Sequence, residues 1–314
     1  MAVQPRARMR NRLSAIRAAS AWLRQAVKEH DVVIVHDPEL VPALIRQRRR
    51  STARLIWDVH EDNPAAVSSR AYIPAILRGT AAAAMRRLER RAESSLTLML
   101  AETDYQQRFT SRHPHVPNTP WVLPRQLVTR ARRVVYVGSI TALRGSEELC
   151  RLGALLAPAG IEVHLIGPID DRVSSDAIAA AVARGEIHAH GRMANAEALQ
   201  FVRESLAGLS LLRDAPNHRH SMPTKVLEYS CVGTPVITTA LPLAVAAVTA
   251  GPGGLVVPFG DADTVARAAA DAVQRLASDP GLVEQLAAGG YATVESSYNW
   301  SRDSIDFLRV VTGS

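Results

Sequence analysis

Apolar and polar residues alternate along the chain in blocks that predict strands separated by helices. Short apolar runs of strand length occupy residues 31–35, 53–58 and 96–101, and stretches with apolar positions three or four residues apart lie between them. The same alternation resumes at residue 134 and continues to about residue 296. It predicts an α/β fold, in which crossover helices connect the strands of a parallel sheet.

Each half of the chain contains its own set of predicted elements. In the first half we expect helices over residues 6–28, 40–49, 73–94 and 104–111 around the three strands. In the second half we expect strands over residues 134–137, 162–166, 187–190 and 208–212 and near residues 236 and 255, with helices over 147–156, 174–184, 195–204, 262–277, 281–296 and 300–311. Between the halves, regular structure is interrupted by Pro114, Pro117, Pro120 and Pro124. We therefore predict two Rossmann-like domains, residues 1–126 and 127–297, and a final helical segment, residues 298–314.

Positive charge is concentrated in the first part of the chain. Residues 1–130 carry an excess of 11 positive charges, whereas residues 131–314 carry an excess of four negative charges. We expect an anionic partner that contacts only the first part. Nucleic acid is disfavoured because aromatic residues make up only 4% and no stacking motif occurs, so we predict an anionic membrane surface. The alternative is that these arginines only solvate helix surfaces.

Residues 221–228 predict a helix whose start binds an anion. We expect Ser221 to cap this helix and Pro223 to lie in its first turn. Backbone N–H groups at a helix start bind anions, and Lys225 adds a positive charge one turn in. Glu228 lies on the same face and can accept hydrogen bonds from two hydroxyl groups. The pattern predicts a nucleotide-sugar site, with the diphosphate at the helix start and the ribose on Glu228; the alternative is an ordinary capped helix with a Lys–Glu surface pair.

Histidines follow two predicted strands of the first half. His36 comes after the strand at 31–35, and His60 comes after the strand at 53–58 and before Glu61 and Asp62. A histidine at a strand end can donate to a phosphate or a sugar hydroxyl; the alternative is that it caps a helix or satisfies a hydrogen bond in the core. The two carboxylates are adjacent in the chain and diverge, so they cannot flank one bond as in a glycosidase.

These segments together resemble the retaining glycosyltransferases of family 4, which have the GT-B fold. The resemblance rests on residues 221–228, on the turn at 233–236, on Arg144 and Gly145, and on residues 58–61, and it covers about residues 31–297. It implies two Rossmann-like domains that face a cleft. It also implies transfer of a sugar from a nucleotide-diphosphate donor, which is a substrate, without a metal ion or other cofactor.

The resemblance further implies roles for individual residues. His60 lies nearest the reacting centre, while Arg144 and Lys225 stabilise the leaving diphosphate, which gives three catalytic positions. Ser139 stands where many relatives have a basic residue, and His220 stands where the family has a glutamate, so the contacts to one phosphate and to the donor sugar differ from the family's pattern. The donor-binding positions are Gly138, Ser139, Gly191, His220, Ser221, Pro223, Thr224 and Glu228.

Metal binding and membrane spanning are not predicted. His218 and His220 have no carboxylate or cysteine close by in sequence that would complete a metal site. Cys150 and Cys231 lie within predicted helices and resemble small core residues in a reducing compartment. No apolar run reaches the roughly 18 residues needed to span a membrane, and the basic first residues lack the apolar stretch of a secretory signal. We expect a cytoplasmic protein that is peripheral on the inner membrane face.

The expected function is transfer of a sugar, with retention of configuration, to a glycan or lipid-linked acceptor in surface polysaccharide or glycoconjugate synthesis. The alternatives are a sugar-nucleotide epimerase and a non-catalytic or truncated nucleotide-binding protein. GT-B first domains usually open with an apolar strand and a glycine-rich loop near residue 10, whereas residues 6–28 here predict a basic helix. We therefore expect an incomplete first domain that exposes an apolar sheet edge or face; the alternative is a compact variant in which that helix rebuilds the wall.

Overall fold

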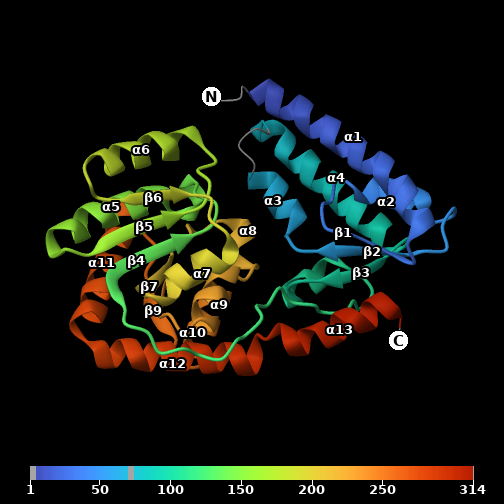
Figure 1. Cartoon of the computed structure of the whole chain (residues 1–314). Helices are drawn as coiled ribbons and strands as arrows, with labels where there is room; N and C mark the ends of the chain where they lie inside the picture. Colours follow the sequence, from blue (N-terminus) through green and yellow to red (C-terminus); the bar gives the residue numbers. More distant parts are fainter. Residues whose placement is uncertain (1–4, 70–73, 314) are drawn as a thin grey trace. The chain divides into compact units, whose positions relative to one another are not determined.

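The structure, a computed structural model, describes residues 5–69 and 74–313. The chain divides into two compact units (Figure 1), the first comprising Met1–Asn118 and Arg302–Ser314 and the second comprising Thr119–Ser301. Among the described residues, none of the helices combines the length and the apolar character needed to cross a membrane.

The first unit is built on a three-stranded parallel sheet. Its strands are β1 (Val32–Val35), β2 (Arg54–Val59) and β3 (Thr97–Leu100), in the order β1-β2-β3. Because both neighbouring pairs are parallel, the carboxyl ends of all three strands lie at one edge. The other elements of this unit are α1 (Pro5–Glu29), α2 (Val41–Gln47), α3 (Asn63–Ser69), α4 (Ala75–Glu93), the 3₁₀-helix η1 (Thr103–Arg108) and, from Arg302 onward, α13 (Trp300–Thr312).

Helix α1 packs its apolar side into the core of this unit. Leu23, Ala26 and Val27 recur at three- and one-residue spacings, are buried, and belong to the same apolar cluster as the side chains of β1 and β2. Burial of an aliphatic side chain such as Leu23 contributes about 1.5–3 kcal/mol, which explains why this end of the helix docks. Trp22, one turn before Ala26, is 64% exposed and lies at the border of this buried face. The side chains of residues 5–13 lie outside the described residues.

The second unit contains a six-stranded parallel sheet in the order β6-β5-β4-β7-β8-β9. The chain builds outward from β4 to β6 on one side and then returns to begin β7 on the other side of β4. Open parallel sheets bind ligands at such a reversal, outside the carboxyl ends of the strands. The strands are β4 (Ala131–Val137), β5 (Glu162–Ile166), β6 (His188–Gly191), β7 (Ser205–Ser210), β8 (Val236–Thr239) and β9 (Gly254–Val257).

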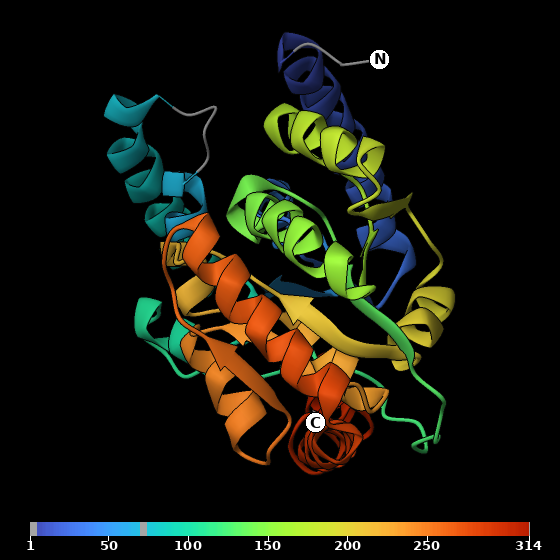
Figure 2. The same ribbon diagram turned by 90° about the vertical axis from the view of Figure 1, so that its left-hand side faces the viewer.

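Helices cover both faces of this sheet. On one face lie α5 (Ser146–Leu156), α6 (Arg172–Ala183) and α11 (Ala262–Ser278), and Figure 2 shows α5 and α11 side by side. On the other face lie α7 (Asn195–Arg203), α9 (Thr224–Cys231), α10 (Pro242–Thr249) and α12 (Pro280–Ser297), with the one-turn helix α8 (Pro216–Arg219) before α9. Two apolar clusters, one on each face, therefore enclose the strands, which explains their nearly continuous apolar sequences.

Two local predictions differ from the structure. The α-helix expected over residues 104–111 is the shorter 3₁₀-helix η1, because the Gln106 side chain bonds the backbone of Ser111 and His113 in place of further helical hydrogen bonds. The sequence also does not predict α3, α8 and α10. Each of these is short and has a proline in its first two positions, where the missing N–H of proline costs little, so the proline starts the helix.

Candidate functional site

Helix α9 is fixed at the reversal point between β4 and β7 by one buried tyrosine. The hydroxyl of Tyr229 accepts a hydrogen bond from the backbone N–H of Val137 at 2.8 Å and donates to the carbonyl of Leu209 at 3.3 Å. The Tyr229 ring crosses β7 at Gly208, where a methyl group would lie 2.2 Å from the ring. A side chain at Gly208 would therefore displace the helix, and neither residue was predicted from the sequence to have this role.

The start of α9 differs from the sequence prediction. The capping position is Pro223, whose side chain makes no capping hydrogen bond, and Thr224 is the first helical residue. The expected cap, Ser221, lies two residues before that position, because Pro223 adopts an extended backbone (ψ 98°) that ends the turn ahead of the helix. The first N–H groups of a helix have no acceptor within it, and the capping residue Pro223 has no side-chain acceptor to offer them. This start can therefore receive an anion.

Lys225 is the most unusual side chain at this edge of the sheet. It is only 8% exposed, and its Nζ lacks a hydrogen-bond partner among the described residues. Nζ lies 3.5 Å from the centroid of the Tyr136 ring, and a methyl group on Gly138 would lie 3.4 Å from it. The ammonium is thus held against the turn that follows β4, at the site where the sequence predicted a diphosphate.

The charges of Lys225, Arg144 and Glu228 influence one another. Burial lowers the pKa of Lys225 well below its usual value, and the positive charge of Arg144 adds to the effect, while Glu228 opposes it. Burial likewise raises the pKa of Glu228, and the charge of Lys225 opposes that shift. The structure therefore brings together Arg144, Lys225 and Glu228, all three of which the sequence assigned to the donor site.

Helix α8 contributes a residue that the sequence assigned no role. Burial lowers the pKa of His218, and the charges of Arg144 and Lys225 lower it further. Its Nδ1 lies 2.9 Å from the carbonyl oxygen of Arg213. The neighbouring Asn217 has a buried Oδ1 with no hydrogen-bond partner within residues 5–69 and 74–313. His218 and Asn217 therefore extend the polar lining of the site; their position just before α9 was the only sequence signal available.

Glycines end the strands on the other side of the reversal point. The N–H of Gly138 donates to the carbonyl of Ile166 at 2.9 Å, and the N–H of Gly167 donates to the carbonyl of Gly191 at 2.7 Å. A methyl group on Gly167 would lie 2.0 Å from the Gly138 carbonyl oxygen, so the two turns approach as closely as only glycine allows. The hydroxyl of Ser139 donates to Asp170, which leaves its backbone as the part that can meet a ligand.

The remaining predicted donor residues lie along the same segment of the second unit. His220 is exposed, and Ser221 and Thr224 are half-buried, whereas Pro223 is buried. Their roles in binding the donor stay predictions.

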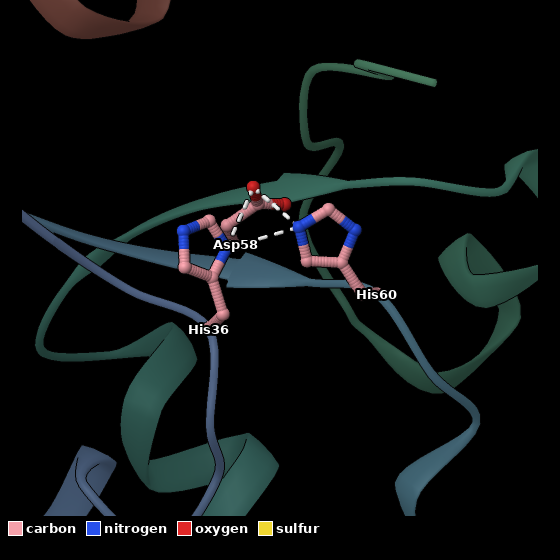
Figure 3. A group of neighbouring side chains, drawn as sticks. All are labelled: His36, Asp58 and His60. Carbon is pink, nitrogen blue, oxygen red and sulfur yellow. Dashed lines mark hydrogen bonds and ion pairs between the residues drawn. The ribbon is translucent and has the colours of Figure 1, made fainter. Parts of the chain in front are cut away.

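In the first unit, three polar side chains converge at the carboxyl ends of β1 and β2 (Figure 3). Oδ2 of Asp58 lies 2.8 Å from Nε2 of His60 and 3.2 Å from Nδ1 of His36, and the two nitrogens lie 3.0 Å apart. Asp58 is 5% exposed, and its other oxygen, Oδ1, is buried without a hydrogen-bond partner among the described residues. Both histidines were predicted from the sequence as site residues, whereas Asp58 was not.

This cluster also has a defined charge. The hydrogen bond to Asp58 raises the pKa of His36 above its usual value, in spite of partial burial. Burial alone would raise the pKa of Asp58, but the hydrogen bonds to His36 and His60 outweigh it, so the pKa of this carboxyl is lowered. Asp58 is therefore a carboxylate that orients both imidazoles.

Solved structures of glycosyltransferases resemble this chain over almost its full length. A Staphylococcus aureus TarM variant solved with UDP, fondaparinux and a GlcNAc-glycerol has a TM-score of 0.71 at 9% identity, covering 93% of this chain and 58% of that one. Sucrose-phosphate synthase from Thermosynechococcus elongatus has a TM-score of 0.69 at 16% identity, covering 100% of this chain and 80% of that one. HepE from Anabaena, solved with UDP-glucose, has a TM-score of 0.73 at 13% identity, covering 94% of this chain and 82% of that one.

These likenesses establish the fold. All three relatives are GT-B proteins, and the parallel sheets with crossover helices described above match them, so this chain has the Rossmann-like GT-B fold that the sequence predicted. The chain spans less than two thirds of the TarM chain. No curated protein matches the sequence.

A family model gives a separate result from the sequence. The model described as glycosyl transferase-like matches residues 149–309, about half of the chain, and this range includes α9 with Lys225 and Glu228. The chain therefore belongs to the glycosyl transferase-like family.

Proposed function

We propose that this protein is a retaining glycosyltransferase of family 4 that transfers a sugar from a nucleoside-diphosphate donor. The observation that carries this proposal is the buried Nζ of Lys225, which lacks a hydrogen-bond partner within the described part of the chain and lies beside Arg144 at the start of α9. A buried ammonium without a partner is costly. An anionic ligand in the same place would supply the missing acceptor, and a diphosphate matches two cations and a helix start.

The residues around Lys225 bind different parts of the donor. The diphosphate is placed on the N–H groups at the start of α9, on Lys225 and on Arg144, while Glu228 accepts hydrogen bonds from the ribose hydroxyls. As the bond from the sugar to the diphosphate breaks, negative charge grows on the leaving group. Cations and dipoles that are already in position stabilise that charge without reorganisation, which lowers the barrier.

Other residues are proposed from their place in the fold. The strand-ending turns at Gly138 and Gly191 let the backbone approach the donor, and Ser139 contributes its N–H there. We assign donor binding to residues 127–297, acceptor binding to residues 1–126 and the contact with the transferred sugar to His60. The acceptor is proposed to be a glycan or a lipid-linked sugar in surface polysaccharide or glycoconjugate synthesis.

The donor site is tested by Glu228→Gln. An amide accepts hydrogen bonds from two hydroxyls less well than a carboxylate, and loss of a charged hydrogen bond costs about 1.5–3 kcal/mol, which is about 10- to 150-fold in affinity. Calorimetric titration with UDP, ADP and GDP should show that loss. Glu197→Gln, at an exposed position of α7 in the same unit, is the matched control and should bind as the unchanged protein does. Equal affinity in both variants would contradict the ribose assignment.

The reaction itself is tested with a panel of nucleotide sugars. A transferase releases the nucleoside diphosphate, slowly by hydrolysis and faster with an acceptor, whereas an epimerase converts the sugar without releasing it. The anomeric configuration of the product, determined by NMR, decides whether configuration is retained. His60→Ala should reduce transfer while leaving nucleoside-diphosphate affinity unchanged; full activity in this variant would show that His60 is not catalytic.

We also propose that the first unit associates with the cytoplasmic face of an anionic membrane. Helix α1 exposes Arg17, Arg24 and Lys28, whose spacing puts them on one face of the helix, and a basic face suits an anionic lipid surface. Each basic residue near an anionic surface contributes about 1 kcal/mol, and salt screens the attraction. In flotation assays at low salt, the protein should rise with anionic vesicles and not with neutral ones; equal recovery with both would refute the proposal.

A further inference from the structure

The atoms that converge in the first unit are all of a kind that binds metal ions. Nδ1 of His36, Nε2 of His60 and Oδ2 of Asp58 form a triangle with sides of 2.8, 3.0 and 3.2 Å (Figure 3). Two imidazole nitrogens and one carboxylate oxygen on one face are the ligand set of many divalent transition-metal sites.

The triangle has the size of one face of a coordination sphere. An ion placed about 1.2 Å above the plane of the three atoms lies about 2.1 Å from each of them, the usual length of zinc bonds to nitrogen and oxygen. The angles between those bonds are about 84–99°, close to the right angles of an octahedral face. The three atoms are therefore already spaced as the ligands of one ion are.

We propose that His36, Asp58 and His60 form a binding site for one divalent transition-metal ion. The second observation that points to a ligand is the buried Oδ1 of Asp58, on a side chain that is 5% exposed, because this oxygen has no hydrogen-bond partner in residues 5–69 and 74–313. It can bind the ion directly or accept a hydrogen bond from a metal-bound water. The side chain of His36 is 62% exposed and that of His60 is 33% exposed, so the remaining coordination positions face solvent.

Buried aromatic residues hold the backbone of both histidines. The indole N–H of Trp57 donates to the carbonyl of His36 at 3.3 Å, and the hydroxyl of Tyr105 donates to the carbonyl of His60 at 3.3 Å. Both aromatic side chains are fully buried. Each histidine is therefore anchored by a rigid neighbour, and a preorganised ligand set costs little to order when the ion binds.

This site goes beyond the proposed function and does not depend on it. An ion in this position is coordinated by Nε2 of His60, so that nitrogen cannot form a hydrogen bond with a sugar while the ion is bound. If His60 contacts the transferred sugar, as proposed above, the ion acts as a reversible inhibitor of transfer. Metal binding is measured without a sugar donor or an acceptor, so the metal site and the glycosyltransferase function can each fail without affecting the test of the other.

A second group in the described residues provides both a competitor and a control. Glu162, His164 and His188 of the second unit also place three metal-ligating atoms near one another. Glu162 is well exposed and His188 lies on the edge strand β6, so these two ligands are less fixed than Asp58. His188→Ala removes this group and leaves the first unit unchanged.

The experiment uses the full chain without an affinity tag and in the His188→Ala background. Zinc binding is followed by calorimetry, and Co²⁺ binding is followed by visible absorption, which reports the coordination geometry. We expect one ion per chain. His36→Ala and Asp58→Asn should each weaken binding at least tenfold, since even loss of a partner outside the ligand set costs about 10- to 100-fold. His30→Ala, an exposed histidine of the same unit, should bind as the parent does.

Several outcomes would overturn the proposal. Unchanged zinc affinity in His36→Ala and Asp58→Asn would show that the ion binds elsewhere. Binding that disappears with His188→Ala would assign it to the second unit, and no binding by the parent at about 0.1 mM zinc would exclude a site of useful affinity. His36 is exposed, so its variant should fold even if Asp58→Asn does not, and circular dichroism of both variants separates loss of the site from loss of the fold.

Discussion

Replacement of Lys225 by methionine separates the binding role of its ammonium from the packing role of its stem. Methionine keeps an unbranched side chain of similar length, so it can still fill the space beside the Tyr136 ring. It removes the charge and the donors of Nζ, which has no hydrogen-bond partner among the described residues. We expect this substitution to move nucleotide affinity and protein stability in opposite directions.

The loss of affinity follows from the contact with the diphosphate. A hydrogen bond to a charged group contributes about 1.5–3 kcal/mol. Because about 1.4 kcal/mol is a factor of ten, Lys225→Met should weaken the binding of UDP about 10- to 150-fold.

The gain in stability follows from the burial of the amine. Burying an ion without a hydrogen-bonded partner costs several kcal/mol. The Nζ–ring contact at 3.5 Å returns about 2 kcal/mol. Without nucleotide, Lys225→Met should therefore stabilise the protein by about 1–3 kcal/mol, and each kcal/mol raises the Tm by about 2–4 °C for a unit of this size.

Titration calorimetry and thermal unfolding measure the two effects, and NMR measures their common cause. Lys28 and Lys225 are the only lysines in the sequence, so isotopically labelled lysine gives two side-chain signals, which Lys225→Met assigns. Burial lowers the pKa of Lys225, so its signal should titrate below the usual range of lysine. UDP should raise that midpoint, because a diphosphate stabilises the charged form.

One combination of results would refute this reasoning. If Lys225→Met binds UDP as tightly as the unchanged protein and is less stable, Lys225 only packs against Tyr136, and the donor site lies elsewhere. Lys28→Met, at an exposed position of α1, is the control and should change neither quantity.

Two further predictions concern stability. Burial raises the pKa of Glu89 to about 7 in spite of the nearby charge of Arg108, so the folded protein binds a proton that the unfolded chain releases near pH 4.5. The stability gained from binding this proton is complete below pH 4.5 and is lost as the pH rises through 7. The free energy of unfolding of Glu89→Gln minus that of the unchanged protein, measured in urea, should therefore be about 3 kcal/mol larger at pH 8 than at pH 4.5. The same difference at both pH values would contradict the pKa shift. Gly167→Ala places a methyl group 2.0 Å from the Gly138 carbonyl oxygen, so it should lower the free energy of unfolding by about 3 kcal/mol or more and weaken UDP binding. The control is Gly160→Ala, whose methyl group meets nothing within 4 Å and which should lower the free energy of unfolding by only about 1–2 kcal/mol, from backbone strain. Equal losses in the two variants would show that the close approach at Gly167 is unimportant.

The fold could be predicted from the sequence because its signals are local. Strands such as β5 (Glu162–Ile166) are apolar runs between helices of period 3.6, and the structure has that strand where the sequence predicted it. The short helices were missed because a proline in their first turn gives the same local signal as a loop. The cap on α9 was misplaced for a related reason, since the backbone of Pro223, and not a side chain oxygen, ends the preceding turn.

The candidate site was only partly predictable because its partners are distant in sequence. Lys225 and Glu228 are one helical turn apart, so their proximity follows from helix geometry. Tyr229 meets Val137 from 92 residues away, and its ring requires Gly208 on a third element. Only strand order brings these residues together. The sequence could therefore identify the groups that bind a ligand but not the residues that hold those groups in place.

Asp58 shows the same limit within a single strand. Side chains of β2 alternate between the two faces of the sheet, and Trp57 and Val59 belong to the core cluster that includes α1, whereas Asp58 points to the opposite face. In the sequence Asp58 is only a polar residue near the end of an apolar run. In the structure the parallel pairing of β1 with β2 sets His36 beside it, and the chain leaving β2 returns His60 to the same carboxylate. A strand period of two, combined with one strand pairing, thus converts three separate residues into one coordination face, and the proposed metal site depends on that pairing.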